Sequence, residues 1–351
     1  MTTNDVVTSI VTGNYEDNSA IQREVINTTL SYICQAIDIL DVPSSSSLVI
    51  ADFGSAYGQN SICAMRSIIK YLKASEKIKD EQQVLVVHND LPTNNWQSLL
   101  ESLKNDQSYK ALISGRSFYE QCLPSNYLAI GYSSNSLHWL SRKPSNILNH
   151  CFSTDGNEKE KELFRQQSRQ DLANFLQHRS NELLIGGILI LSIPSTDMKT
   201  QTVYHVYGDF IYRWAQFFLT ESELFEFTIP VYFRTFDECV DTDLFDQHSL
   251  KLISAEMITT RFPVFEQYRQ GQLTIDQLAK QVVTALRVCC DSALEQLMKT
   301  NGRSEEEIKK ILEQIWIAGE EEIKSKPFEL DVPLMNALII LKKTQTIINA
   351  N

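Results

Sequence analysis

The sequence predicts an α/β fold in which a mostly parallel, Rossmann-like sheet is flanked by helices and covered by a helical cap. In the first 200 residues, short apolar runs that end in polar residues alternate with segments of helical periodicity. From about residue 205 the pattern changes to long helical stretches, and two further apolar runs arrive late in the chain. This order is typical of one open sheet with helical insertions.

The first half of the chain supplies most of the predicted sheet. Residues 19–40 have apolar residues at helical spacing, and "DVPSSSS" ends that helix. The buried strand "LVIADFG", the helix "SICAMRSIIKYLKAS" and the strand "QVLVVHND" then form a βαβ unit. Residues 126–134 and 186–195 fit two more buried parallel strands, with a helix over 161–183 between them.

The second half supplies the predicted cap and the last strands. Residues 207–225 and 266–324 are helical, whereas "SLKLISAEMI" and "LMNALIILKKT" are expected to be strands. No linker rich in Pro, Gly and Ser divides the chain, so we expect a single catalytic unit over residues 1–351. Its expected parts are an N-terminal segment (1–29), an α/β core (about 30–200, 227–260 and 328–349) and the cap (about 205–226 and 262–325).

Composition excludes several classes of partner. A net charge of −12 and scattered basic residues disfavour nucleic acid. The start of the sequence lacks a secretion signal, and the longest apolar run, "LLIGGILILSI", is too short to span a bilayer. Seven cysteines show neither a CxxC motif nor zinc-ligand spacing, and we interpret them as free thiols. The sequence therefore predicts a cytoplasmic protein without a membrane, nucleic-acid or metal partner.

One glycine turn, "IADFGSAYGQNS", raises the question of a cofactor. The turn follows a strand ending in Asp52 and places Gly54 and Gly58 where open α/β sheets bind ligands. It matches neither the dinucleotide fingerprint nor a phosphate loop. An acid here suits a sulfonium or ammonium cation, and Asp90 at the end of the next strand suits ribose hydroxyls. The alternative is that both acids only cap turns or helices.

Four ordered stretches together resemble the SABATH family of S-adenosylmethionine-dependent methyltransferases, which methylate salicylate, jasmonate, related acids and xanthine nitrogens. They are "GNYEDNSAIQREV", "IADFGSAYGQNS", "HNDLPTNNWQSLLESL" and "SGRSFYEQCLPSNYLAIGYSSNSLHWLSRKP". The turn "SAYGQN" departs from the family's usual Cys-Ser-Ser-Gly-x-Asn, and "SGRSF" departs from Val-Pro-Gly-Ser-Phe. The resemblance implies a class I methyltransferase sheet, a helical cap over the acceptor site and a homodimer.

The resemblance also implies a set of cofactor-binding residues. S-adenosylmethionine would contact Asp52, Gly54 and Asn60 with its methionine end, and Tyr15 near its methyl group. Asp90 and Leu91 would hold its ribose and adenine, and Ser117 with Phe118 would complete the adenine wall. An aromatic ring offers a flat apolar face to a purine, although such a Phe is more often plain core.

On the acceptor side, the resemblance implies that Gln22 and Trp139 tether a substrate carboxylate and that His138 faces the acceptor. Two neutral donors orient a carboxylate without neutralising it, so its oxygen stays nucleophilic. Trp139 could instead be a core residue whose indole N–H bonds to backbone, and His138 could be structural. Candidate pocket walls are the aromatic residues Trp214, Phe217, Phe218, Tyr232 and Phe233, which favour an apolar or aromatic acid.

Carboxylic acids are already ionised at neutral pH, so we expect neither a general base nor an essential metal. The leading hypothesis is therefore methylation of the carboxylate of a small acid to a methyl ester. Three alternatives stay open: N- or O-methylation of a heterocycle or phenol, a nicotinamide oxidoreductase, and a cofactor-binding homologue without turnover.

Overall fold

The computed structural model describes residues 20–41, 47–104, 106–197 and 203–345. Its centre is a mixed sheet with the strand order β3-β2-β1-β4-β5-β8-β7, and the short β6 pairs with the end of β5. The strands are β1 (Ser47–Phe53), β2 (Gln83–Asp90), β3 (Lys110–Gly115), β4 (Leu128–Ser134), β5 (Leu183–Thr196), β6 (Arg234–Thr235), β7 (Leu250–Thr260) and β8 (Leu334–Lys343).

Strands β1 to β5 are parallel, whereas β8 runs antiparallel between β5 and β7. The parallel strands β1 and β4 are buried along nearly their whole length, as expected for a sheet covered on both faces. The predicted mostly parallel sheet is confirmed, and both late apolar runs are strands. The sequence analysis did not predict β3, because its residues are exposed and lack an apolar period of two.

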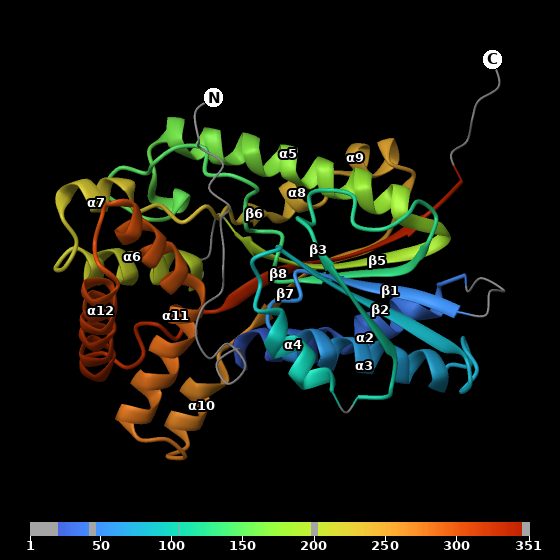
Figure 1. Ribbon diagram of the computed structural model, residues 1–351, viewed down its shortest axis with the longest axis horizontal. Helices are drawn as coiled ribbons and strands as arrows, with labels where there is room; N and C mark the ends of the chain where they lie inside the picture. Colours follow the sequence, from blue (N-terminus) through green and yellow to red (C-terminus); the bar gives the residue numbers. More distant parts are fainter. Residues whose placement is uncertain (1–19, 42–46, 105, 198–202, 346–351) are drawn as a thin grey trace.

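Helices cover both faces of the sheet (Figure 1). One face carries α2 (Ala20–Asp38), α3 (Gln59–Ala74) and α4 (Trp96–Leu103), and the opposite face carries α5 (Glu158–Glu182), α8 (Phe236–Cys239) and α9 (Thr242–Gln247). Helix α5 begins with a capping box in which the Asn157 side chain accepts from the Glu160 amide. Each layer has its own apolar core against the sheet.

The remaining helices form the cap at the left of Figure 1: α6 (Val203–Ala215), α7 (Glu221–Glu226), α10 (Pro263–Arg269), α11 (Ile275–Thr300) and α12 (Glu305–Ser325). They share a separate apolar core in which Trp214 and Trp316 meet edge to face. Gly319 of α12 lets the Trp214 ring approach, since an added Cβ would lie 2.9 Å from it. Among the described helices, none has the length and hydropathy to cross a membrane.

Candidate functional site

A cavity of about 550 Å³ lies between the carboxyl ends of the parallel strands and the cap. Its floor comes from residues at the ends of four strands: Gly54 after β1, Asp90 of β2, Ser134 of β4 and Pro194 of β5. Its opposite wall comes from α6 and α11 of the cap. Ligands of open α/β sheets bind at this edge, where loops of several strands converge.

The glycine turn after β1 has a backbone that requires its glycine. Gly54 has φ +97°, and an added Cβ would lie 2.1 Å from Ser136 Oγ. The amides of Gly54 and Ser55 both donate to the Asn89 carbonyl at 2.9 Å, which joins the turn to β2. A side chain at this position would therefore collide with Ser136, and Gly54 lines the cavity with backbone alone.

Asp90 joins the same turn to the end of β2. Its Oδ2 accepts from the Ala56 amide at 2.7 Å and its Oδ1 from the Leu91 amide at 2.8 Å. Burial raises the pKa of its carboxyl, and the two amide bonds oppose that shift. The capping role is compatible with a ligand role, because each carboxylate oxygen keeps a second lone pair and Asp90 lines the cavity.

Ser117 and Phe118 also line the cavity, on a loop that a buried ion pair holds in place. Arg179 donates to the carbonyls of Phe118 and Glu120 at 2.8 Å and pairs with Glu182 at 2.8 Å. Both charged side chains are fully buried, so each depends on the other for its neutralisation. A glycine turn, a carboxylate with free lone pairs and an aromatic ring together suit a nucleoside with ribose hydroxyls and a purine.

Two predicted cofactor residues, Asp52 and Asn60, do not line the cavity and are 4 % and 7 % exposed. The Asp52 side chain bonds to Ser61 of α3, while its neighbour Phe53 packs on Phe175 of α5, as strand alternation requires. Burial raises the pKa of Asp52 to about 7. Their contact with the methionine end of a cofactor stays a prediction.

His138 and Trp139 line the cavity from the chain segment that follows β4. The Tyr232 amide donates to the His138 carbonyl at 2.9 Å, and the Leu140 amide donates to the Pro230 carbonyl at 2.8 Å. Within the described part of the chain, the Trp139 indole N–H has no hydrogen-bond partner. The alternative of an indole bonded to backbone is therefore disfavoured.

The remaining predicted residues lie where the structure gives no side-chain description. Tyr15 precedes the described residues, and Gln22 lies in α2 without a described side chain.

Of the five aromatic residues predicted to wall the pocket, Phe233 lines the cavity. Trp214 is buried in the cap core, Phe217 is exposed, and neither Phe218 nor Tyr232 lines the cavity.

Sequence reasoning missed the aromatic residues that do line the cap side, namely Phe152, Tyr204 and Tyr207. Tyr204 and Tyr207 stand three residues apart in "VYHVYG", so one face of α6 carries both rings. That spacing is present in the sequence, but the pocket walls were predicted from the denser cluster of aromatic residues later in the chain.

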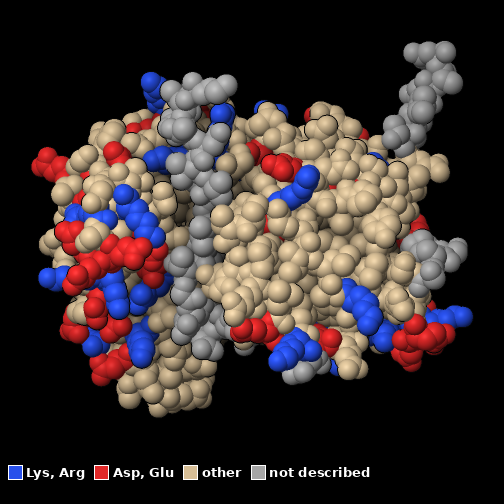
Figure 2. Space-filling view, in the orientation of Figure 1, with Lys and Arg blue, Asp and Glu red and all other residues tan. Residues whose placement is uncertain are grey.

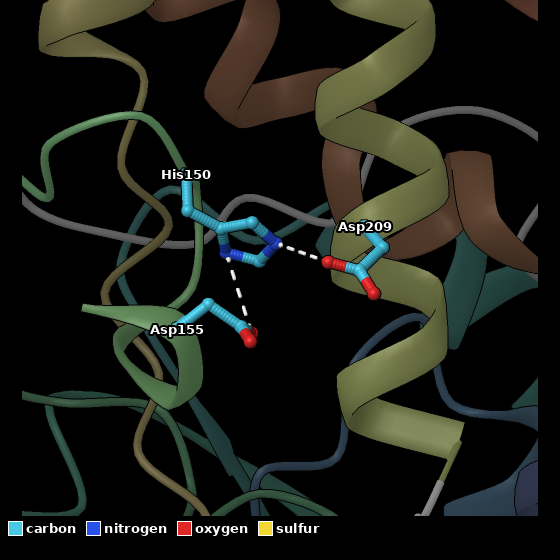
Figure 3. A group of neighbouring side chains, drawn as sticks. All are labelled: His150, Asp155 and Asp209. Carbon is cyan, nitrogen blue, oxygen red and sulfur yellow. Dashed lines mark hydrogen bonds and ion pairs between the residues drawn. The ribbon is translucent and has the colours of Figure 1, made fainter.

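One group of side chains outside the cavity resembles a metal site in composition. Figure 3 shows His150 between Asp155 and Asp209. Its Nε2 lies 3.1 Å from Asp209 Oδ1, whereas Asp155 Oδ2 lies 3.7 Å from the other ring nitrogen, Nδ1. The Phe152 amide already lies 3.0 Å from Nδ1. Because the two acids face different ring nitrogens, the group links α6 to the loop before α5 rather than enclosing one ion.

Comparison with known proteins shows which family this chain is similar to. The family model described as SAM dependent carboxyl methyltransferase matches residues 11–344. Farnesoic acid carboxyl-O-methyltransferase of Arabidopsis thaliana is 32% identical over 251 residues, which is 64% of this chain and 71% of that protein. Loganic acid O-methyltransferase of Catharanthus roseus is 29% identical over 199 residues, which is 52% of this chain and 53% of that protein.

The fold agrees with that match. A solved loganic acid methyltransferase with S-adenosylhomocysteine superposes with a TM-score of 0.79 and 19% identity, over 97% of this chain and 100% of the other. The predicted class I methyltransferase fold is confirmed, and a nicotinamide oxidoreductase is excluded by the family match. Since the match spans both the strand ends and the cap, the chain belongs to the SABATH family of S-adenosylmethionine-dependent carboxyl methyltransferases.

Proposed function

We propose that this enzyme esterifies a small monocarboxylic acid with an apolar or aromatic skeleton, using S-adenosylmethionine as methyl donor. The observation that carries the proposal is one continuous cavity. It contains the carboxylate of Asp90 on the sheet side and, on the acceptor side, the indole N–H of Trp139, for which no partner is found among the described residues. The Arabidopsis and Catharanthus relatives, named for farnesoic and loganic acid, support an acid as acceptor.

We assign the sheet side of the cavity to the cofactor. Asp90 and Leu91 would hold the ribose and adenine, Ser117 and Phe118 would flank the adenine, and Gly54 would admit the methionine end. Asp52, Asn60 and Tyr15 would complete the methionine end, as the family resemblance implies. When bound, S-adenosylmethionine supplies an electrophilic methyl group on a sulfonium.

On the acceptor side, the chain's residues would position the acid substrate rather than deprotonate it. Trp139 and Gln22 would donate to the acid's carboxylate, which is ionised at neutral pH and needs no base. Burial lowers the pKa of His138 to about 3, so its ring is neutral and does not compete as a cation for the carboxylate. Orienting the oxygen in a cavity closed by the cap contributes to the rate through proximity, and no metal is assigned a role.

The test is titration calorimetry with S-adenosylhomocysteine, followed by radiolabelled methyl transfer to a panel of small carboxylic acids. Micromolar binding and a base-labile methyl ester are expected. A base-stable product would instead indicate N- or O-methylation of a heterocycle or phenol. Cofactor binding without transfer to any acceptor would indicate the homologue without turnover.

The raised pKa of Asp52 predicts a pH-dependent cofactor affinity. If the carboxylate lies beside the cofactor's ammonium, binding needs its ionised form, and below pH 7 the free enzyme must first release a proton. We expect the Kd of S-adenosylhomocysteine to rise about tenfold from pH 8 to pH 6, and the profile of Asp52→Asn to be flatter. A wild-type profile as flat as that of the variant would remove Asp52 from the cofactor site.

We further propose that the protein acts as one catalytic unit and as a homodimer joined at β3. This edge strand exposes Leu112 (47%) and Ile113 (41%), contains no proline and carries one charge, at Lys110. Figure 2 shows a face around it largely free of charged side chains. Two chains of charge −12 approach most easily there, and antiparallel pairing of two β3 edges would be self-complementary.

Light scattering should give twice the 40.1 kDa of one chain. Ile113→Lys should yield the single-chain mass because it places like charges opposite each other across the pairing, whereas Ile185→Lys, at an exposed position on β5, should stay dimeric. An unaltered mass for Ile113→Lys would exclude the β3 edge as the interface.

We also propose a cytoplasmic location, since none of the seven cysteines forms a disulfide. Imaging of the tagged protein would test it.

A further inference from the structure

The cap side of the cavity is apolar except at a few positions. A run of stacked rings forms part of its wall: His138 lies 5.5 Å from Phe233 with 20° between the planes, and Phe233 lies 3.9 Å from Tyr204 with 12°. Tyr207 lies one helical turn beyond Tyr204 on α6 and lines the same cavity. The charged residues that line the cavity in the described part of the chain are Asp90, Glu120 and Arg142, and none of them lies on a cap helix.

Two buried polar atoms on this wall, His138 Nδ1 and Tyr207 Oη, have no hydrogen-bond partner among the residues that the structure describes. The neighbouring Tyr204 differs, because its hydroxyl donates to the Met335 carbonyl at 3.4 Å. Buried polar atoms without partners are rare in native proteins, since each loses its bonds to water and gains nothing in return. In a ligand cavity, the missing partner is expected to come from the ligand.

The chemistry of that partner follows from the charges present. Burial raises the pKa of the Tyr207 phenol, so it remains a neutral hydroxyl that both donates and accepts. Among the described residues, no cationic side chain of the cap helices lines the cavity, so a second carboxylate beside Tyr207 would meet no counter-charge from these helices. No acidic side chain of the described cap helices lines the cavity either, so an ammonium beside Tyr207 would likewise meet no counter-charge from them. A neutral oxygen of the ligand avoids both costs, because no charge is buried with it.

We infer that the acceptor is an oxygenated monocarboxylic acid, whose hydroxyl or carbonyl oxygen, remote from the carboxylate, hydrogen-bonds to Tyr207 Oη. The inference rests on the proposed carboxyl methylation and names its substrate class. The carboxylate lies at Trp139 and His138, the apolar skeleton lies along the stacked rings, and the second oxygen lies at α6. Tyr207 is accordingly a specificity-determining residue, and it takes no part in methyl transfer itself.

The experiment compares matched acids on the full chain saturated with S-adenosylmethionine. The pairs are decanoic acid with 10-hydroxydecanoic acid, and 3-phenylpropanoic acid with its 4-hydroxy derivative. In each pair, the ratio of kcat/KM for the oxygenated acid to that for its apolar partner is measured. At least one pair should favour the oxygenated acid about five- to tenfold in the wild type, and Tyr207→Phe should bring that ratio close to one.

Tyr212→Phe is the matched control, because it removes a hydroxyl from the same helix outside the cavity lining and should keep the wild-type ratio. Melting temperatures verify that both variants fold. The inference fails if neither pair shows a preference in the wild type, or if Tyr207→Phe keeps the preference. Absence of transfer to any of the four acids, and to the wider acid panel, would overturn the proposed function as well.

Discussion

Replacement of Asp90 by alanine is expected to weaken binding of S-adenosylhomocysteine at least about 100-fold. With Asp90 assigned to the ribose, the variant would lose two charge-assisted bonds to the ribose hydroxyls, each contributing about 1.5 to 3 kcal/mol. It also leaves the amides of Ala56 and Leu91 without the acceptors they have at 2.7 and 2.8 Å, so the glycine turn loses one of its links to β2. Calorimetry measures the change directly.

Two further variants separate the ribose contact from the support of the turn. Asp90→Asn keeps one oxygen for a backbone amide but removes the charge, and we expect about a tenfold loss. Asp106→Asn alters another hydrogen-bonded carboxylate, one paired with Arg66 away from the cavity, and should bind like the wild type. An unchanged affinity in Asp90→Ala would refute the ribose assignment.

Replacement of Trp139 by phenylalanine is expected to raise the KM for the acid about ten- to 100-fold. The ring remains, but the N–H that would donate to the carboxylate is lost, and hydrogen bonds to charged groups are the stronger ones. Trp139→Ala should raise KM further because it also opens the wall of the cavity. The affinity for S-adenosylhomocysteine should stay close to that of the wild type, since the residues proposed to bind the cofactor, such as Asp90, lie on the sheet side of the cavity.

Trp316 offers a matched control for a purely structural role. Its indole donates to Asp291 at 2.6 Å within the cap core, so Trp316→Phe should lower the melting temperature and leave KM unaltered. If Trp139→Phe instead abolished cofactor binding together with stability, Trp139 would be a core residue and the acceptor would be tethered elsewhere.

Much of the sheet side of the site was predictable because its signals are local. A continuous apolar run reports a strand buried on both faces, and a glycine and an acid directly after such runs must lie at one edge of a parallel sheet. Gly54 and Asp90 are accordingly at the cavity, and so are Leu91, Ser117 and Phe118, which only the family resemblance implied. Asp52 shows where such local signals stop being sufficient. It lies at the end of β1, the strand before Gly54, yet strand alternation directs its side chain toward Ser61 of α3.

The cap could not be derived in the same way. Its helices were recognisable from their period, but several faces of α6 carry aromatic residues, and the period does not say which face meets the cavity. Packing decides it, since Trp214 is held in the cap core by Gly319 and Trp316 while Tyr204 and Tyr207 face the ligand space. The insertion of β8 between β5 and β7 likewise depends on pairing between distant segments.

The sequence by itself determined the fold class, the family, the methyl donor and the strand-end residues at the cavity, because each depends on short-range order along the chain. Only the tertiary structure decided which aromatic side chains line the acceptor space. It also decided which polar atoms, Tyr207 Oη among them, are left without partners. Those features arise where the cap helices pack on the strand ends. This packing joins segments that are far apart in the chain, so it cannot be derived from any one of them.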